Sequence, residues 1–230
     1  MEIYLIRHGD MAGDPHACYE PPVSGCLSVL GRQQVDALAR ALAEVRFDRV
    51  FSSPLGRAIQ TAQPLASQSD AAIELLPWLT EWRPAPVMGE CADADFESIL
   101  AAAAKLRPEE CWKTPAGEGT LEMAHRIICG FVKLMTQLGA PPGHGGYLLN
   151  DPDRPQRIAL VAHGGSLGCL AAFLLGIPIR PYAPLALAQT GVARFTLEPR
   201  ADVWYPLLHL PAPVPAAAAV AVADPALAVK

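Results

Sequence analysis

Two short stretches of the chain are continuously hydrophobic, and both run into a His-Gly pair. Residues 3–6 lead into Arg7-His8-Gly9, and residues 158–162 lead into His163-Gly164. Strands that are covered on both faces, as in parallel sheets, have this uninterrupted pattern. We therefore predict an α/β fold in which both stretches are buried strands. Each then presents an imidazole at its carboxyl end, where ligands bind in open α/β sheets.

Helical and strand patterns fill most of the chain between these two stretches and beyond the second. Ser28 is suited to cap the first helix, because its hydroxyl can accept a hydrogen bond from a free backbone N–H group. Gly176 is suited to end the last helix. The hydrophobic spacing predicts helices at 30–45, 121–138 and 167–174 and further strands at 49–51, 73–76 and 192–198.

A further helix is expected directly after the strand at 49–51. Ser53 is suited to be its N-cap, with Pro54 in the first helical position, where a missing N–H costs nothing. This places Arg57 about one turn into the helix, near its positive end and at the carboxyl edge of the sheet. Pro64 is expected to kink or end this helix.

Three irregular regions and a tail complete the organisation. Segments 10–27 and 139–156 are rich in proline and glycine and are predicted to be loops. Segment 83–118, with a short helix at 95–106, is predicted to be a small insertion over the site. We predict one domain over residues 1–210, followed by an Ala/Pro-rich tail at 211–230.

Composition narrows the possible classes of protein. The 230 residues are 51% hydrophobic and carry a formal net charge of −5, enough for one sizeable α/β core and without a global basic field for nucleic acid. No hydrophobic run is long enough for a membrane span. Six cysteines without a C-x-x-C pair and no apparent signal peptide indicate a cytoplasmic protein with reduced thiols. His16 and Cys18 lack further ligands at metal spacing, so neither metal nor cofactor is expected.

Four side chains can form a phosphate-binding cup if the predicted strand ends meet. Arg7 and Arg57 offer forked guanidinium donors, and His8 and His163 offer imidazoles. Nearby guanidinium charges keep an imidazole neutral and therefore nucleophilic. Such a cup can stabilise the charge of a transferring phosphoryl group.

Glu81 is the candidate acid for the leaving group. It lies in a loop between Trp78 and Trp82, and aromatic neighbours reduce contact with water and favour a neutral carboxylic acid. The same carboxyl can later act as base towards water. An exposed surface glutamate is an equally weighted interpretation of the local sequence.

The sequence resembles the histidine phosphatase, or phosphoglycerate mutase-like, superfamily. The similarity is carried in order by several motifs: Ile6-Arg7-His8-Gly9, Leu27-Ser28-x-Leu30-Gly31-x-x-Gln34, Ser52-Ser53-Pro54-Leu55-x-Arg57-Ala58-x-Gln60-Thr61-Ala62, Leu79-Thr80-Glu81 and Val161-Ala162-His163-Gly164-Gly165. The resemblance implies a three-layer α/β/α sandwich with a mostly parallel central sheet. It also implies His8 as the phosphorylated nucleophile, Arg7, Arg57 and His163 as the phosphate pocket, and Glu81 as the proton donor. Gly164 after His163 implies the branch of mutases and small-molecule phosphatases.

Some positions depart from the family pattern. After the Arg-His-Gly, many relatives have Glu, then Thr or Ser, and then Asn; this chain has Asp10, Met11 and Asp14 at these positions. Gly119 likewise takes the place of a serine that is common in the family. The insertion carries few of the basic residues of glycerate mutases, its positive charges being Arg83, Lys105, Arg107 and Lys113. We therefore expect a metal-independent phosphomonoesterase acting on a small-molecule phosphate ester. A phosphotransferase or mutase, or a binding protein without turnover, remains an alternative, and the sequence does not specify the oligomeric state.

Overall fold

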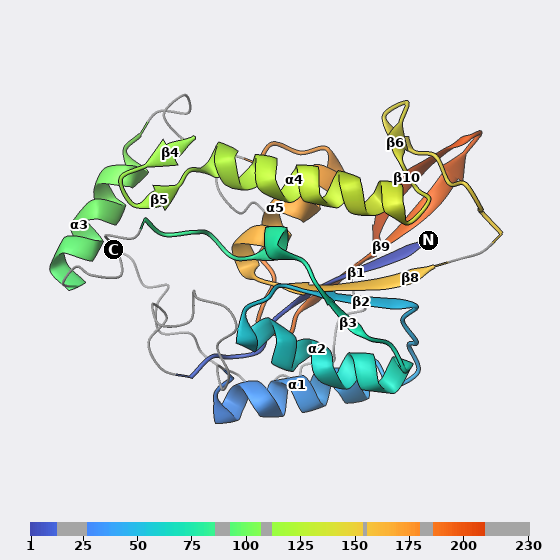
Figure 1. Ribbon diagram of the computed structural model, residues 1–230, viewed down its shortest axis with the longest axis horizontal. Coiled ribbons are helices and arrows are strands. Elements are labelled where there is room, and N and C mark those ends of the chain that lie inside the picture. Colours follow the sequence, from blue (N-terminus) through green and yellow to red (C-terminus); the bar gives the residue numbers. More distant parts are fainter. Residues whose placement is uncertain (13–26, 86–92, 107–111, 154–155, 180–185, 210–230) are drawn as a thin grey trace.

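The computed structural model of the chain describes residues 1–12, 27–85, 93–106, 112–153, 156–179 and 186–209 (Figure 1). The strands are β1 (Glu2–Arg7), β2 (Arg49–Ser52), β3 (Ile73–Leu75), β4 (Lys113–Thr114), β5 (Gly117–Glu118), β6 (Pro142–Gly143), β7 (Gly146–Tyr147), β8 (Arg157–Ala162), β9 (Val192–Arg200) and β10 (Val203–His209). The helices are α1 (Val29–Ala41), α2 (Gly56–Ser69), the 3-10 turn η2 (Pro77–Leu79), α3 (Asp93–Ala104), α4 (Thr120–Gln137) and α5 (Gly164–Leu175).

The described strands form one eight-stranded sheet and a separate two-stranded ladder of β4 and β5. The order in the large sheet is β3-β2-β8-β1-β9-β10-β7-β6. Strands β3, β2, β8 and β1 are parallel, and β9, β10, β7 and β6 continue the sheet with antiparallel pairings. The predicted strands at 49–51, 73–76 and 192–198 are confirmed. Strand β10 and the β6–β7 hairpin were not anticipated.

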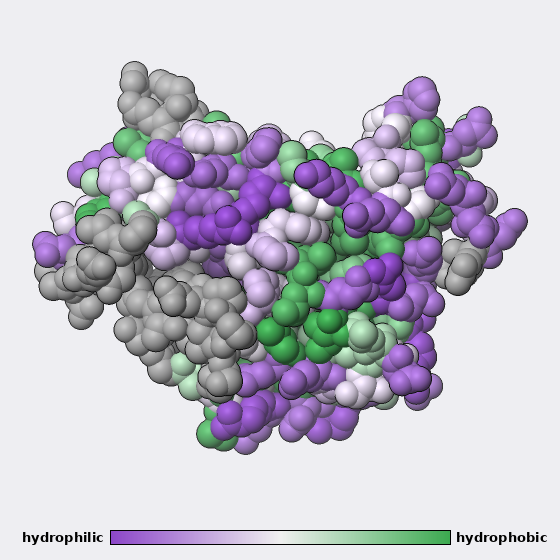
Figure 2. Space-filling model, in the orientation of Figure 1, coloured by the Kyte–Doolittle hydropathy of each residue, from purple (hydrophilic) through white to green (hydrophobic). Residues whose placement is uncertain are grey.

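Helices cover both faces of the sheet, α1 and α2 on one side and α4 and α5 on the other (Figure 1). Alternating residues of β1 explain this arrangement. Ile3 and Leu5 are buried with the hydrophobic residues of α4 and α5, whereas Tyr4 and Ile6 are buried with those of α1 and α2. The predicted three-layer α/β/α fold is therefore confirmed, but the sheet is mixed rather than mostly parallel, because β9 runs antiparallel to β1 and the β9–β10 and β6–β7 hairpins extend the sheet. The outward surfaces of α1 and α4 are largely hydrophilic, as their amphipathic patterns require (Figure 2).

Helix α1 begins as predicted, whereas α2 differs from prediction at both ends. The Ser28 hydroxyl accepts a hydrogen bond from the Gly31 backbone N–H at 2.9 Å and caps α1. Helix α2 begins at Gly56 with Leu55 as its N-cap, so the predicted start at Pro54 with Ser53 as the cap is wrong. The Ser53 hydroxyl instead accepts from the Leu55 N–H at 3.3 Å and lies 2.8 Å from Nε2 of His163. Of the two expectations for Pro64, an end to the helix is wrong, since α2 continues to Ser69, and a kink at this residue stays a prediction. Burial of the hydrophobic face of α2 offsets the lost backbone hydrogen bond.

Helix α3 confirms the short helix predicted within segment 83–118. The single-domain interpretation and the insertion stay predictions, and the tail at 211–230 lies outside the described residues. Cys129 and Cys169 are free thiols, and the other four cysteines also lie outside the described residues. None of the helices in the described part of the chain combines the length and the hydrophobicity that crossing a bilayer requires.

Candidate active site

Strand register brings the two predicted imidazoles together. Strands β1 and β8 are parallel neighbours, with Arg7 opposite Ala162, so His8 and His163 follow at the same level of the sheet. The backbone N–H of His8 donates to the Ala162 carbonyl at 2.9 Å. The centroids of the two imidazole rings lie 5.0 Å apart. The sequence prediction that both side chains share one edge of the sheet is confirmed.

The hydrogen bonds of His8 fix its tautomer. Its Nδ1 lies 2.6 Å from the Gly9 carbonyl oxygen, which can only accept, so Nδ1 carries the hydrogen. The lone pair is consequently on Nε2, where it accepts a hydrogen bond from Nε of Arg57 at 3.2 Å. Burial, opposed by the bond to Gly9 and aided by Arg57 and Arg7, lowers the pKa of His8 to about 3. His8 is therefore a neutral imidazole with a directed lone pair.

His163 is the more deeply buried of the two imidazoles. It has no exposed surface, and its Nε2 lies 2.8 Å from the Ser53 hydroxyl. Burial, reinforced by the charges of Arg57 and Arg7, lowers the pKa of His163 well below its ordinary value. It is therefore neutral as well, at the amino end of α5, where the free backbone N–H groups favour an anion.

The two predicted guanidiniums lie against these imidazoles. Arg57, the second residue of α2, is 3% exposed. Arg7 donates from one terminal nitrogen to the Leu187 carbonyl at 2.7 Å, and its guanidinium packs over Gly164, where an added Cβ would lie 3.4 Å from its central carbon. The four predicted cup residues, Arg7, His8, Arg57 and His163, therefore line one shared site.

Two polar atoms of this cup are buried without a hydrogen-bond partner among the described residues. They are Nε of Arg7 and Nδ1 of His163. Buried polar atoms are nearly always bonded in native proteins, so such a pair in one place indicates a site for a polar ligand. With two guanidiniums beside it, the ligand that this site fits is an anion.

Glu81 lies next to the cup. One carboxylate oxygen accepts a hydrogen bond from the backbone N–H of Gly165, the second residue of α5, at 3.0 Å. The other accepts from the N–H of Trp82 at 2.9 Å. The flanking indoles do not enclose the carboxyl group as expected: Trp78 packs against Gly130 of α4, and Trp82 donates to the Glu118 carbonyl. Its role as acid stays a prediction.

Both carboxylate oxygens of Asp10 are hydrogen-bonded to groups outside the cup. One of its carboxylate oxygens accepts from the Ser28 hydroxyl at 2.5 Å and the other from the side-chain amide of Gln189 at 2.9 Å. These bonds hold Asp10 against the start of α1 and the turn before β9. Asp14, the other acidic departure, lies outside the described residues.

Sequence reasoning missed four residues that support the site. Ser53 contacts His163, and Thr61 bonds both the Gly9 backbone N–H and the Arg57 carbonyl. Arg126 and Glu118 form a buried ion pair behind the Glu81 loop. Ser53 and Thr61 lie in the same sequence motif as Arg57, from which only the arginine was predicted to be a site residue. Arg126 follows the hydrophobic stripe of α4 and gave no separate signal.

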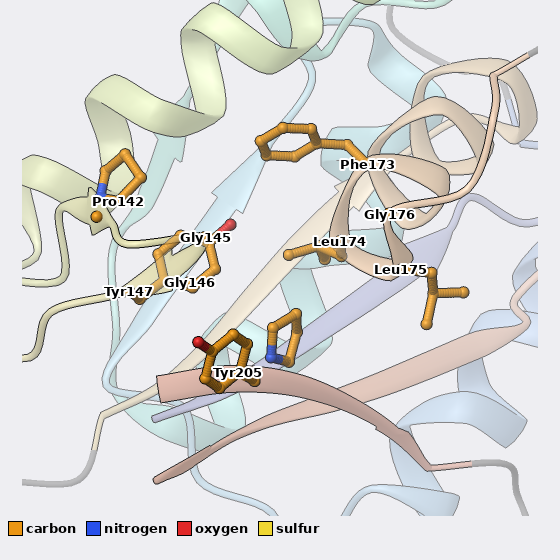
Figure 3. Close-up of a pocket in the computed structure, with 11 residues that line it drawn as sticks. Pro142, Gly145, Gly146, Tyr147, Phe173, Leu174, Leu175, Gly176 and Tyr205 are labelled. Carbon is orange, nitrogen blue, oxygen red and sulfur yellow. The ribbon is translucent and has the colours of Figure 1, made fainter. Parts of the chain in front are cut away.

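A cavity of about 480 Å³ lies elsewhere, between the C-terminal end of α5 and the β6–β7 hairpin. The rings of Tyr147, Phe173 and Tyr205 surround it (Figure 3). His163 is at the opposite end of α5, and none of the cup residues lines this cavity. Among the described residues, no three His, Cys, Asp or Glu side chains are grouped as a metal site requires.

Comparison with known proteins now identifies the family. The family model described as histidine phosphatase superfamily (branch 1) matches residues 3–205. The chain belongs to this superfamily. It is accordingly an enzyme of the histidine phosphatase type, and the resemblance to this superfamily that the sequence motifs indicate is confirmed.

Named relatives in this superfamily include both phosphatases and mutases. A glucosyl-3-phosphoglycerate phosphatase from Mycolicibacterium vanbaalenii is 30% identical over 181 residues, covering 77% of this chain and 75% of the relative. A probable phosphoglycerate mutase, GpmB, from Escherichia fergusonii is 27% identical over 205 residues, covering 84% of each chain.

Solved structures agree with the fold. The α-ribazole phosphatase from Shigella flexneri superposes with a TM-score of 0.67 at 22% identity, covering 90% of this chain and 95% of that chain. A mycobacterial glucosyl-3-phosphoglycerate phosphatase gives a TM-score of 0.65 at 24% identity, covering 91% and 97%. At these identities the likeness shows the fold alone.

Proposed function

We propose that this histidine phosphatase is a phosphomonoesterase that hydrolyses a small phosphate ester through a phosphohistidine at Nε2 of His8. The observation that carries the proposal is the fixed tautomer of His8. Because Nδ1 donates to the Gly9 carbonyl, the lone pair of Nε2 is held inside the cup beside Arg57. A neutral imidazole in this position is ready to attack phosphorus.

The first step transfers the phosphoryl group to the enzyme. The Nε2 lone pair forms a bond to phosphorus while the bond from phosphorus to the ester oxygen breaks, and Glu81 gives its proton to the departing alcohol oxygen. Arg7, Arg57 and His163 surround the transferring group and stabilise its equatorial oxygens. Since guanidiniums supply the positive charge, the step needs no metal ion.

The second step returns the enzyme to its starting state. A water molecule attacks the phosphorus of the phosphohistidine, and the Glu81 carboxylate takes a proton from that water. The N–P bond breaks, phosphate leaves, and the electron pair returns to Nε2 of His8. Glu81 is then protonated again and ready for the next ester.

Support for hydrolysis over transfer comes from the charges near the site. Of the few cations between 83 and 118, Arg83 is occupied by the Thr80 hydroxyl and the Pro77 carbonyl, which leaves it poorly placed to hold a glycerate carboxylate. The phosphatase relatives act, by their names, on glucosyl-3-phosphoglycerate and α-ribazole phosphate. We infer a small organic phosphate ester of this general kind as substrate.

The test is a panel of phosphate esters assayed with a chelator present. The panel contains an aryl phosphate, 3-phosphoglycerate, glucosyl-3-phosphoglycerate and α-ribazole phosphate. Wild type is expected to release inorganic phosphate and to trap an acid-labile phosphoenzyme. His8→Ala is expected to lose both, whereas His125→Asn, a change at an exposed histidine of α4, retains both. Full hydrolysis by folded His8→Ala contradicts the mechanism, and transfer to an added alcohol faster than to water indicates a mutase instead.

A further inference from the structure

The backbone around Glu81 turns its carbonyl groups towards one buried place. The carbonyl oxygens of Trp78, Thr80 and Glu81 all accept hydrogen bonds from the guanidinium of Arg126, a residue of α4, at 2.6, 3.1 and 3.3 Å respectively. The Thr80 hydroxyl oxygen accepts from the same guanidinium at 3.2 Å. A run of buried carbonyls in a loop needs donors, and here one side chain from a distant helix supplies them.

Arg126 uses all three of its guanidinium nitrogens in this place. Nε donates to one carboxylate oxygen of Glu118 at 2.7 Å, and a terminal nitrogen donates to the other at 2.6 Å. The remaining donors reach the loop. A lysine has a single nitrogen with three N–H groups and cannot hold a carboxylate on two sides and three carbonyls at once.

Glu118 is itself held in a fixed position relative to the loop. Its backbone N–H donates to the Arg83 carbonyl at 2.9 Å, and its carboxylate accepts from the Arg83 N–H at 3.3 Å. The Trp82 indole N–H donates to the backbone carbonyl oxygen of Glu118 at 2.5 Å. The side chains of Glu118 and Arg126 are only 5% and 11% exposed, so solvent screens the pair little.

From these contacts we propose that Arg126 and Glu118 are positioning residues, here called the Arg126–Glu118 clamp, which hold the Glu81 carboxyl at the amino end of α5. The proposal rests on the proposed function, in which Glu81 is the proton donor. Neither clamp residue touches the cup. The clamp acts by fixing the carbonyls of Glu81 and of the loop before it, which keeps the Glu81 side chain on the Gly165 N–H beside the cup.

The proposal predicts that damage to the clamp depends on the leaving group. An alkyl phosphate needs a proton on its departing oxygen, whereas a dinitrophenyl phosphate leaves without one. General acid catalysis contributes roughly 10²- to 10⁴-fold, and small displacements of a catalytic group are costly. We expect Arg126→Lys to lower kcat/KM for the alkyl ester at least about tenfold more than for the dinitrophenyl ester. Glu81→Gln is expected to show the same selectivity, more strongly.

Two further variants make this comparison decisive. Lys133→Met removes a positive charge from an exposed position of the same helix and is expected to leave both rates unchanged. Glu118→Gln keeps the shape of the carboxylate and replaces Arg126→Lys if that variant does not fold; it is expected to show a weaker form of the same selectivity. Equal losses for both esters, or no loss, in a folded clamp variant overturn the proposal.

A second readout separates failure of the clamp from failure of the proposed function. The NMR shift of the Gly165 amide reports its hydrogen bond to Glu81, whatever the chemistry of the enzyme. We expect this shift to move in Arg126→Lys in the direction seen in Glu81→Gln, and not in Lys133→Met. An unmoved shift refutes the clamp. A moved shift together with a Glu81→Gln variant that hydrolyses both esters normally supports the clamp and refutes Glu81 as the acid.

Discussion

His8 illustrates at the scale of one residue how burial keeps a proposed nucleophile neutral and costs stability in acid. Its pKa falls from an ordinary 6.5 to about 3 in the folded protein, chiefly through burial. Between these values the unfolded chain binds a proton that the folded chain does not. The free energy of unfolding therefore falls as the pH is lowered from about 6.5 towards about 3, by up to roughly 1.4 kcal/mol per pH unit for this group.

This linkage can be measured by comparing wild type with His8→Gln. Glutamine is neutral at every pH, so the variant lacks the contribution of His8, while other groups titrate alike in both proteins. We expect the difference in unfolding free energy, obtained from denaturant titrations, to shift in favour of His8→Gln as the pH falls from 6 to 4. A difference that stays constant over this range contradicts a neutral, buried His8.

Thr61 provides a second prediction at the residue scale. Its hydroxyl accepts from the Gly9 N–H at 3.1 Å and donates to the Arg57 carbonyl at 2.7 Å, joining α2 to the turn that follows His8. Thr61→Val keeps the shape but leaves the Gly9 N–H buried and unpaired, which we expect to cost about 1–3 kcal/mol of unfolding free energy and most of the activity.

The matched variant for this hydrogen bond is Thr61→Ser. It keeps the hydroxyl and loses one methyl group, which we expect to cost about 1 kcal/mol and to retain activity. Chemical denaturation and aryl phosphate assays of the two variants decide between hydrogen bonding and packing. If Thr61→Ser is as damaging as Thr61→Val, the methyl group contributes as much as the hydroxyl, and the hydrogen bonds alone do not explain the loss.

At the scale of elements, α1 and the segment after β1 approach each other at Gly31. A Cβ atom added to Gly31 would lie 2.0 Å from the carbonyl oxygen of Asp10. Replacing glycine by alanine within a helix favours the helix by about 1 kcal/mol. Forcing an extra carbon against backbone atoms costs more, about 2 kcal/mol. We therefore expect Gly31→Ala to destabilise the protein and to reduce turnover by displacing the turn that holds His8.

The control for this helix is Gln33→Ala, an exposed position two residues later in α1. Thermal unfolding and turnover of the two variants give the comparison. Gln33→Ala is expected to match wild type, because it changes helix propensity slightly and touches no other element. Stability of Gly31→Ala at or above that of wild type would show that α1 and the segment at Asp10 can separate without cost.

The elements also show which parts of the fold and site were predictable from sequence. Strands β1 and β8 are recognisable from their hydrophobic runs, and the carboxyl ends of parallel strands lie at one edge of a sheet, so His8 and His163 could both be placed at that edge in advance. The register that sets them at the same level is known only from the structure. Arg57 could be placed at the same edge because it lies near the start of a helix that follows a strand. Glu81 could be named from its loop, but not its contact with Gly165, which depends on the packing of a distant helix.

What could not be predicted depends on tertiary contacts. Strand β10 contains Pro206, which argues against a strand in the sequence. The proline is tolerated because β7 pairs with β10 only at Trp204, so most of the outer edge of β10 has no strand partner in the described residues. Arg126 likewise meets its partners 45 to 48 residues earlier in the chain, and no local pattern encodes that meeting.

At the scale of the whole molecule, a cationic cup is set within a chain of net charge −5. The surrounding charge opposes the approach of anions, so binding depends on the short-range donors of Arg7, Arg57 and α5 and not on a long-range field. Inorganic phosphate should occupy these donors and stabilise the folded state by mass action, by about 2.7 kcal/mol at a hundredfold excess over its dissociation constant.

We therefore expect inorganic phosphate at this excess to raise Tm by roughly 5–10 °C in wild type, judged from the usual relation between stability and Tm for domains of this size. Arg57→Met should abolish the shift, because the cup then loses one of its two forked cations. Arg49→Met should keep it, since Arg49 is paired with Glu74 in an exposed ion pair at the edge of the sheet. Chloride at equal ionic strength controls for screening.

Addition of a chelator should leave the phosphate-induced shift in Tm unchanged, because guanidiniums hold the anion. A shift that disappears with the chelator would mean that a metal ion holds the anion instead.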